Sequence, residues 1–209
     1  ADGRLTPTVP LNQGDGPVSA SNTARQAGAR LGVALLWDLG TGADTYESLR
    51  MSQGAAVMGI AVLLDAGGVD QFSAEALSQG ASFGGIGILN NLGLDRDTYR
   101  VWHAGQGYGT GGGLGALLEH GGADDYLAEP GGPAGAGVLY FAPTDRGVSN
   151  RNLAQGVGVG ESGTFAGGFG VLWDAQGTDA YRAGTYAQAY GAYRSYGTLV
   201  DRDGNDTYE

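Results

Sequence analysis

A short motif, Asp-x-aromatic, recurs along this chain at a nearly fixed interval of about 27 residues, which lies within the range of periods that mark repeat architectures. The six copies are Asp44/Tyr46, Asp70/Phe72, Asp97/Tyr99, Asp124/Tyr126, Asp179/Tyr181 and Asp206/Tyr208. The steps between successive aspartates are 26, 27, 27, 55 and 27. The longest step corresponds to two units, one of which lacks the motif. A fixed period of this kind predicts an array of one small structural unit stacked on itself, rather than a conventional globular core.

Each unit also contains an apolar segment of six or seven residues, and we call its last residue the anchor. The seven anchors are Asp38, Asp65, Asn91, Glu119, Phe141, Asp174 and Asp201. Two positions before every anchor stands a leucine, and two positions before that leucine stands an alanine or a glycine. Segments that are apolar at both odd and even positions and rich in β-branched residues favour strands. The regularly placed glycines disfavour a helix.

The expected fold class is therefore all-β: a parallel β-solenoid (β-helix) of about seven 27-residue coils. Residues 1–23 are expected to form an irregular cap or lead-in, and residues 24–209 the repeat domain. A β-propeller is the alternative, but its blades usually need ~40 residues or more. The unit at about 128–163 is degenerate, because Phe141 replaces the acidic anchor and no Asp-x-Tyr follows. Its long loop, 145–163, is either an insertion at a coil corner or a recognition loop.

Charge and composition exclude several classes of partner. The net charge is −11 and the chain contains no lysine, which argues against nucleic acid and anionic membranes as partners. It has no cysteine, so disulfides and thiolate metal sites are excluded. No segment approaches 18 continuous apolar residues, so no membrane insertion is expected. The 42 glycines lie within patterned apolar segments, which indicates a role in packing.

A glutamine also recurs, at a similar offset ahead of most anchors. Its copies are Gln26, Gln53, Gln79, Gln106 and Gln188. Identical amides stacked at the strand spacing of ~4.8 Å can hydrogen-bond to one another, so we expect a buried glutamine column. The alternative is a solvated glutamine in a turn.

Two acidic columns form the strongest candidate site. If coils stack, the anchors make one column and the motif aspartates make a second. Candidate metal ligands are Asp38, Asp65, Glu119, Asp174 and Asp201 in the first column, which also holds Asn91, and Asp44, Asp70, Asp97, Asp124, Asp179 and Asp206 in the second. Carboxylates ~5 Å apart repel by ~3 kcal/mol per pair at an effective dielectric near 20. Hard oxygen ligands in Gly-rich loops suit Ca²⁺. The alternative is an Asx-turn, in which each aspartate bonds its own turn backbone.

Two resemblances accompany these residues. The pieces 67–72, 121–126 and 204–208 resemble fragments of the RTX calcium-binding nonapeptide over five or six residues per unit. The period of about 27 rather than 9 argues against a continuous RTX roll. The whole unit, G-x-G-x-L-x-D-x-G-G-x-D-x-Y, is similar to uncharacterised bacterial Gly/Asp-rich repeat proteins over most of the chain. That resemblance implies a β-solenoid at the cell surface or outside the cell.

Catalytic signals are poor, and no catalytic or cofactor-binding residue is predicted. The two histidines, His103 and His120, stand at different offsets in adjacent units. The sequence contains no G-x-S-x-G, H-E-x-x-H or P-loop. The glycines of 107–115 imitate a dinucleotide fingerprint, but one residue in five of this chain is glycine. The acids repeat along the whole length, whereas an active site is singular.

We therefore expect a non-enzymatic structural or binding module of an exported bacterial protein, calcium-stabilised and mediating surface assembly or adhesion. Expected partners are a second copy, another domain of the parent protein, or a glycan or surface polymer. The side chains that alternate with the leucines, Val33, Ile60, Ile86, Leu114 and Phe169, are expected to face outward as an apolar stripe. Such a stripe would be covered by lateral self-association, by another domain, or by a fold-back of this chain's own Gly-rich strand in a flattened two-layer solenoid.

Two alternatives remain open. An ice-binding solenoid would need a regular threonine face, but the residue after the second aspartate is mixed: Thr45, Gln71, Thr98, Asp125, Ala180 and Thr207. A carbohydrate-active enzyme would need non-repeated acids or arginines near 145–163.

Overall fold

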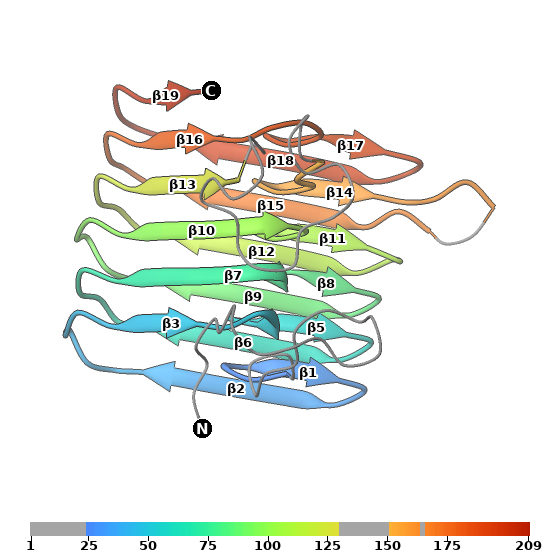
Figure 1. Cartoon of the computed structure of the whole chain (residues 1–209), viewed down its shortest axis with the longest axis horizontal. Coiled ribbons are helices and arrows are strands. Elements are labelled where there is room, and N and C mark those ends of the chain that lie inside the picture. The colour runs from blue at the N-terminus through green and yellow to red at the C-terminus, as the bar shows by residue number, and fades with distance from the viewer. Residues whose placement is uncertain (1–23, 130–150, 164–165) are drawn as a thin grey trace, which may run out of the picture.

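The protein is an all-β solenoid in the computed structural model, which describes residues 24–129, 151–163 and 166–209. The chain winds through six coils that build three parallel sheets (Figure 1). Each coil adds one strand to each sheet, except that the first coil adds two strands to the third sheet. The predicted fold class is confirmed. The described residues contain no helix that is long and apolar enough to cross a membrane.

The strands follow one another in the same order in every coil. Sheet 1 contains β1 (Gly28–Arg30), β5 (Ala55–Val57), β8 (Ser82–Phe83), β11 (Tyr108–Thr110), β14 (Val157–Val159) and β17 (Gly191–Ala192). Sheet 2 contains β2 (Val33–Asp38), β6 (Ile60–Asp65), β9 (Ile86–Asn91), β12 (Leu114–Glu119), β15 (Phe169–Asp174) and β18 (Tyr196–Asp201). Sheet 3 contains β3 (Thr45–Glu47), β7 (Gln71–Ser78), β10 (Thr98–His103), β13 (Asp125–Ala128), β16 (Ala180–Arg182) and β19 (Thr207–Tyr208), and β4 (Arg50–Ser52) also pairs with β7.

The number of coils differs from the expected seven. Strand β12 pairs directly with β15, so that Glu119 lies beside Asp174 with no coil between them. The long interval between Asp124 and Asp179 therefore holds one coil with extra chain at its corners, not two units. The expected fifth anchor, Phe141, lies outside the described residues. Within the expected loop 145–163, residues 157–159 form β14 and belong to sheet 1.

Sheet 2 separates its side chains cleanly by parity. The second, fourth and sixth positions of each strand point inward, and the first, third and fifth point outward, as the alternating burial shows. The leucines at the fourth position align in register, and Leu63, Leu89, Leu117 and Leu172 are fully buried. The predicted inward leucine column is confirmed, because strands with period-two side chains must place equivalent residues on the same face.

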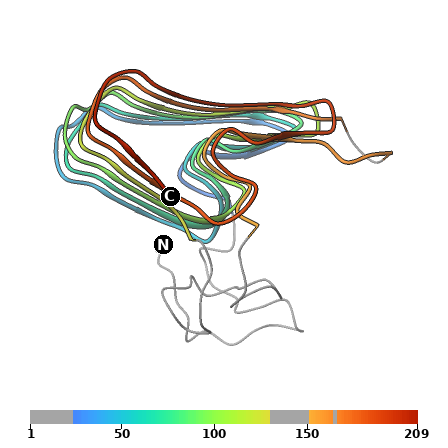
Figure 2. The same ribbon diagram turned by 90° about the horizontal axis from the view of Figure 1, so that it is seen from above.

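Seen from above, the stacked coils outline a wide lobe and a narrow limb (Figure 2). In the narrow limb, sheets 1 and 2 lie so close in the third to sixth coils that the second position of sheet 2 is glycine there, whereas the first two coils carry Ala34 and Ala61. A Cβ atom on Gly115 would lie 1.9 Å from the carbonyl oxygen of Tyr108, and one on Gly170 would lie 2.1 Å from that of Val157. Two sheets normally pack ~10 Å apart with side chains between them. In the narrow limb the glycines of sheet 2 leave no side chain between the two backbones, which lie close together.

The wide lobe is filled by leucines and by a stack of aromatic rings from sheet 3. Tyr46, Phe72, Tyr99, Tyr126, Tyr181 and Tyr208 lie in one column. Successive ring centroids are 4.7 to 5.0 Å apart, and the rings are within 7° of parallel. Parallel in-register strands impose this spacing on identical side chains. The aromatic column and the leucine column pack together as one core.

The glutamine column is present and buried, but its hydrogen bonds differ from those expected. The side-chain amide of Gln79 donates to the carbonyl oxygens of Phe72 and Arg100, at 3.0 and 2.8 Å. Each such amide therefore joins the sheet 3 strands of two neighbouring coils instead of bonding mainly to the next glutamine. Gln155, which was not predicted from the sequence, occupies the column in the fifth coil and bonds in the same way. The Gln-Gly dipeptide at this position matches the pattern of the column. It was missed because the additional chain before Gln155 makes its distance from Gln106 much longer than one repeat.

Candidate functional site

The two predicted acidic columns face each other inside the corner that joins sheet 2 to sheet 3. The anchors end the strands of sheet 2, and the motif aspartates stand just before the strands of sheet 3. In the four inner coils both columns are buried, with side chains at most 2% exposed. In the first and last coils the equivalent acids are only half-buried. The stack therefore places a line of acids in the interior of the protein.

The anchors form Asx-turns, which were the alternative to metal binding that the sequence left open. Oδ1 of Asp65 accepts the backbone N–H of Gly67 at 2.9 Å, and Oδ1 of Asn91 accepts that of Gly93 at 3.0 Å. Asp38 and Asp174 make the same bond two residues ahead. One oxygen of each of these anchors is thus occupied by its own Asx-turn.

The motif aspartates bond from coil to coil. Oδ1 of Asp97 accepts the backbone N–H of Asp70 at 2.6 Å, and Oδ1 of Asp124 accepts that of Asp97 at 2.7 Å. Asp179 and Asp206 continue the series. A carboxylate that accepts a backbone N–H is stabilised as an anion, so this ladder fixes one oxygen of each motif aspartate from Asp70 to Asp206.

Tyrosine hydroxyls satisfy the second oxygen of the anchors, a role that was not predicted from the sequence. The Tyr46 hydroxyl donates to Oδ2 of Asp65 at 2.5 Å, one coil further along, and the Tyr126 hydroxyl donates to Oδ2 of Asp174 at 2.7 Å. Tyr99 bonds Glu119 in the same manner. The aromatic column therefore supplies core volume and also hydrogen-bond donors to the acids.

The third coil replaces this arrangement with a neutral one. Its anchor is Asn91, and the ring below that anchor is Phe72, which has no hydroxyl to donate. The Asn91 amide instead donates to Oδ2 of Asp97 at 2.8 Å. Phe72 thus lacks the hydroxyl donor and Asn91 lacks the carboxylate that would accept it. In exchange, Asp97 receives a hydrogen bond from the Asn91 amide.

Motif aspartates in other inner coils have no such donor. Oδ2 of Asp70, Asp124 and Asp179 is buried and has no hydrogen-bond partner among the described residues. An unpaired buried polar group costs free energy, and an unpaired charge costs more. The ion pairs Arg50–Glu75, Arg100–Glu129 and Arg182–Asp125 all use acids outside the two columns.

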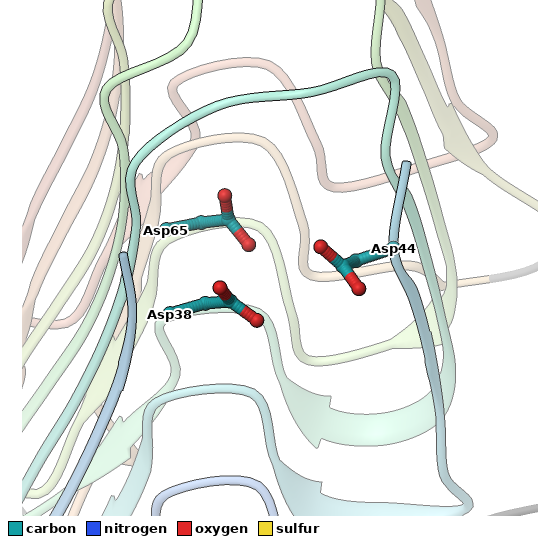
Figure 3. A group of neighbouring side chains, drawn as sticks. All are labelled: Asp38, Asp44 and Asp65. Atoms are coloured by element: carbon teal, nitrogen blue, oxygen red, sulfur yellow. The ribbon is translucent and has the colours of Figure 1, made fainter. Parts of the chain in front are cut away.

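Three groups of acids bring carboxylate oxygens within 4.8 Å of one another: Asp38/Asp44/Asp65, Asp124/Asp174/Asp179 and Asp179/Asp201/Asp206. In the first group Asp38 and Asp65 project from neighbouring coils toward Asp44 on the opposite wall (Figure 3). Eight of the eleven predicted ligands are thus gathered into such groups, and Asp70, Asp97 and Glu119 are not.

Burial shifts the titration of these acids. Loss of hydration, together with the neighbouring carboxylates, raises the pKa of Asp70 to about 6 and that of Asp97 to about 7, although their backbone hydrogen bonds act in the opposite direction. Because the folded pKa lies above the unfolded one, the folded state binds the proton more tightly. The resulting stability is complete below pH ~4 and is lost as pH rises through the folded pKa values.

We therefore expect the chelator-treated protein to melt at a lower temperature at about pH 9 than at about pH 5. Calorimetry in EDTA across this range measures the trend. A melting temperature that stays level or rises with pH would contradict the assigned pKa directions.

Residues outside the columns bear on the remaining predictions. His103 bonds the carbonyl oxygen of Arg151, whereas His120 bonds the side chain of Asn90, so the two histidines do not share a site. A groove of about 510 Å³ near the coil-five corner is lined by Tyr186, Arg151 and Glu161, among others. This is the position where the carbohydrate-active alternative requires non-repeated charged residues, and that alternative stays a prediction.

Comparison of the chain with protein-family models, with curated protein sequences and with solved structures gave no significant match.

Proposed function

We propose that this chain is a non-enzymatic structural module of an exported bacterial protein that assembles side by side with a second copy of itself. The observation that supports the proposal is the outer face of sheet 2, formed by the first, third and fifth side chains of its six strands. These side chains are Val33, Leu35, Trp37, Ile60, Val62, Leu64, Ile86, Ile88, Asn90, Leu114, Ala116, Leu118, Phe169, Val171, Trp173, Tyr196, Thr198 and Val200. None of them is charged at neutral pH, although the chain carries a net charge of −11.

The area of this face favours a second copy as its partner. Six-residue strands are roughly 20 Å long at about 3.3 Å per residue, and six of them span about 29 Å, so the face covers about 570 Å². Two such faces in contact would remove on the order of 1,100 Å² from solvent, near the lower limit for specific interfaces. An identical copy also matches the strand spacing of the face, so the side chains of two facing sheets can interdigitate.

Replacing Ile86 by Glu is expected to abolish self-association. Ile86 is 39% exposed on the outer face of sheet 2, so the substitution costs little in folding but places a charge in the interface. Light scattering across a concentration series measures the change. Association of the unaltered chain should strengthen with salt, because screening weakens the repulsion between two acidic copies.

The matched control is Leu94→Glu, which introduces the same charge at an exposed apolar residue of a corner turn outside sheet 2. This variant should associate like the unaltered chain. A strictly monomeric unaltered chain at its highest soluble concentration would reject the proposal, as would equal association of the two variants.

A further inference from the structure

The acids between the fourth and fifth coils combine three features that occur together nowhere else in the described part of the columns. Asp124, Asp174 and Asp179 are all at most 2% exposed. Their carboxylate oxygens lie within 4.8 Å of one another. Two of the three residues also have a buried oxygen without a hydrogen-bond partner, Oδ2 of Asp124 and Oδ2 of Asp179. The other two acidic groups each include members from the half-buried end coils.

Hydrogen bonds already in place limit what Asp174 can offer to the two unpartnered oxygens. Oδ1 of Asp174 accepts the N–H of Gln176, and its Oδ2 accepts the hydroxyl of Tyr126. A proton on Asp174 would therefore displace one of these donors and would satisfy only one of the two oxygens. A cation is attracted to every carboxylate around it, and each oxygen keeps a lone pair for it.

The chain contains its own comparison for this site. In the third coil an amide, Asn91, stands at the position of Asp174 and donates to Oδ2 of Asp97. Oδ2 of Asp97 therefore has a hydrogen-bond partner, whereas Oδ2 of Asp179 is buried without one. The oxygen is left open where the anchor is acidic, and it is filled where the anchor is neutral.

We propose that Asp124, Asp174 and Asp179 bind one calcium ion between the fourth and fifth coils. Oxygens within 4.8 Å of one another are close enough to contact a single ion, and carboxylate oxygens are hard ligands that suit calcium. Three carboxylates also give the negative charge that a divalent cation neutralises.

The test variant is Tyr126→Phe/Asp174→Asn, which reproduces in the fifth coil the native Phe72–Asn91 arrangement. The matched control is Tyr196→Phe/Asp95→Asn, the same pair of changes at two exposed residues. Binding is followed by calorimetric titration of the chelator-treated 209-residue chain with Ca²⁺. A second probe is Tb³⁺, whose emission is sensitised by nearby tyrosines such as Tyr126 and Tyr181, both bonded to Asp174.

The unaltered chain and the control should melt higher in Ca²⁺ than in EDTA, because a ligand that binds only the native state stabilises it. The test variant should bind one ion fewer and lose most tyrosine-sensitised Tb³⁺ emission. In EDTA it should melt higher than the unaltered chain, since one charge is removed and an amide donates to Asp179.

Equal melting of the unaltered chain in Ca²⁺ and EDTA would overturn the proposal, as would an undiminished number of ions in the test variant. If the test variant does not fold, Asp124→Asn provides the same comparison of bound ions, and retention of every ion by that variant would also overturn the proposal.

Discussion

A single methyl group at Gly115 is expected to destabilise the protein by at least ~3 kcal/mol. Its Cβ would lie 1.9 Å from the carbonyl oxygen of Tyr108 and 2.7 Å from that of Gly80, and both are backbone atoms that cannot rotate away. The two sheets of the narrow limb would have to separate. Chemical denaturation of Gly115→Ala measures the loss.

Separation at one coil is opposed by the coils on either side, because Gly87 and Gly170 hold the same close approach next to Gly115. The first two coils carry alanine at this position, where Ala61 packs on the side chains of Ala29 and Ala56. A suitable control is Gly32→Ala, since a Cβ there would meet nothing closer than 3.7 Å. Equal stability of the two alanine variants would show that the limb can widen locally.

Replacing Leu89 by Ala is expected to cost ~2–5 kcal/mol, through lost transfer free energy and an unfilled cavity. Leu89 is fully buried between Leu63 and Leu117 in the leucine column. Coils contact only their neighbours, so the loss should be largest in coils two to four.

Hydrogen exchange resolved by segment tests this distribution, with Leu94→Ala as a control at a side chain that is 66% exposed. Uniform loss of protection in all six coils would contradict nearest-neighbour stability and show that the solenoid opens as one unit.

Much of the fold could be predicted from the sequence because each side chain of a stacked coil repeats its environment. The parity of sheet 2, the leucine column and the two acidic columns follow from the fixed period along the chain together with the period of two within a strand. The number of coils did not follow. The additional chain is about as long as one unit, and the apolar sequence ending at Phe141 matches the pattern of the other units.

The hydrogen bonds of the acidic columns were predictable only in part. An Asx-turn is local, so Asp65 and Gly67 suffice to predict it. The bond from Tyr46 to Asp65 joins neighbouring coils, and its direction depends on which coil lies above the ring. Phe72 and Asn91 are both visible in the sequence. Their correspondence can be recognised only once it is known that each tyrosine bonds the anchor of the next coil.

Strand β12 pairs directly with β15 although the chain between them is unusually long. A strand's position along the axis of the solenoid therefore does not depend on the length of chain that precedes it. Tyr108 pairs with Val157, whereas Gly28 pairs with Ala55 over a much shorter stretch of chain, yet each pair spans a single step of the stack. The longer chain between β13 and β14 therefore leaves the pairing of every later strand unchanged, so a strand's place along the stack is set by its pairing partners and not by its residue number.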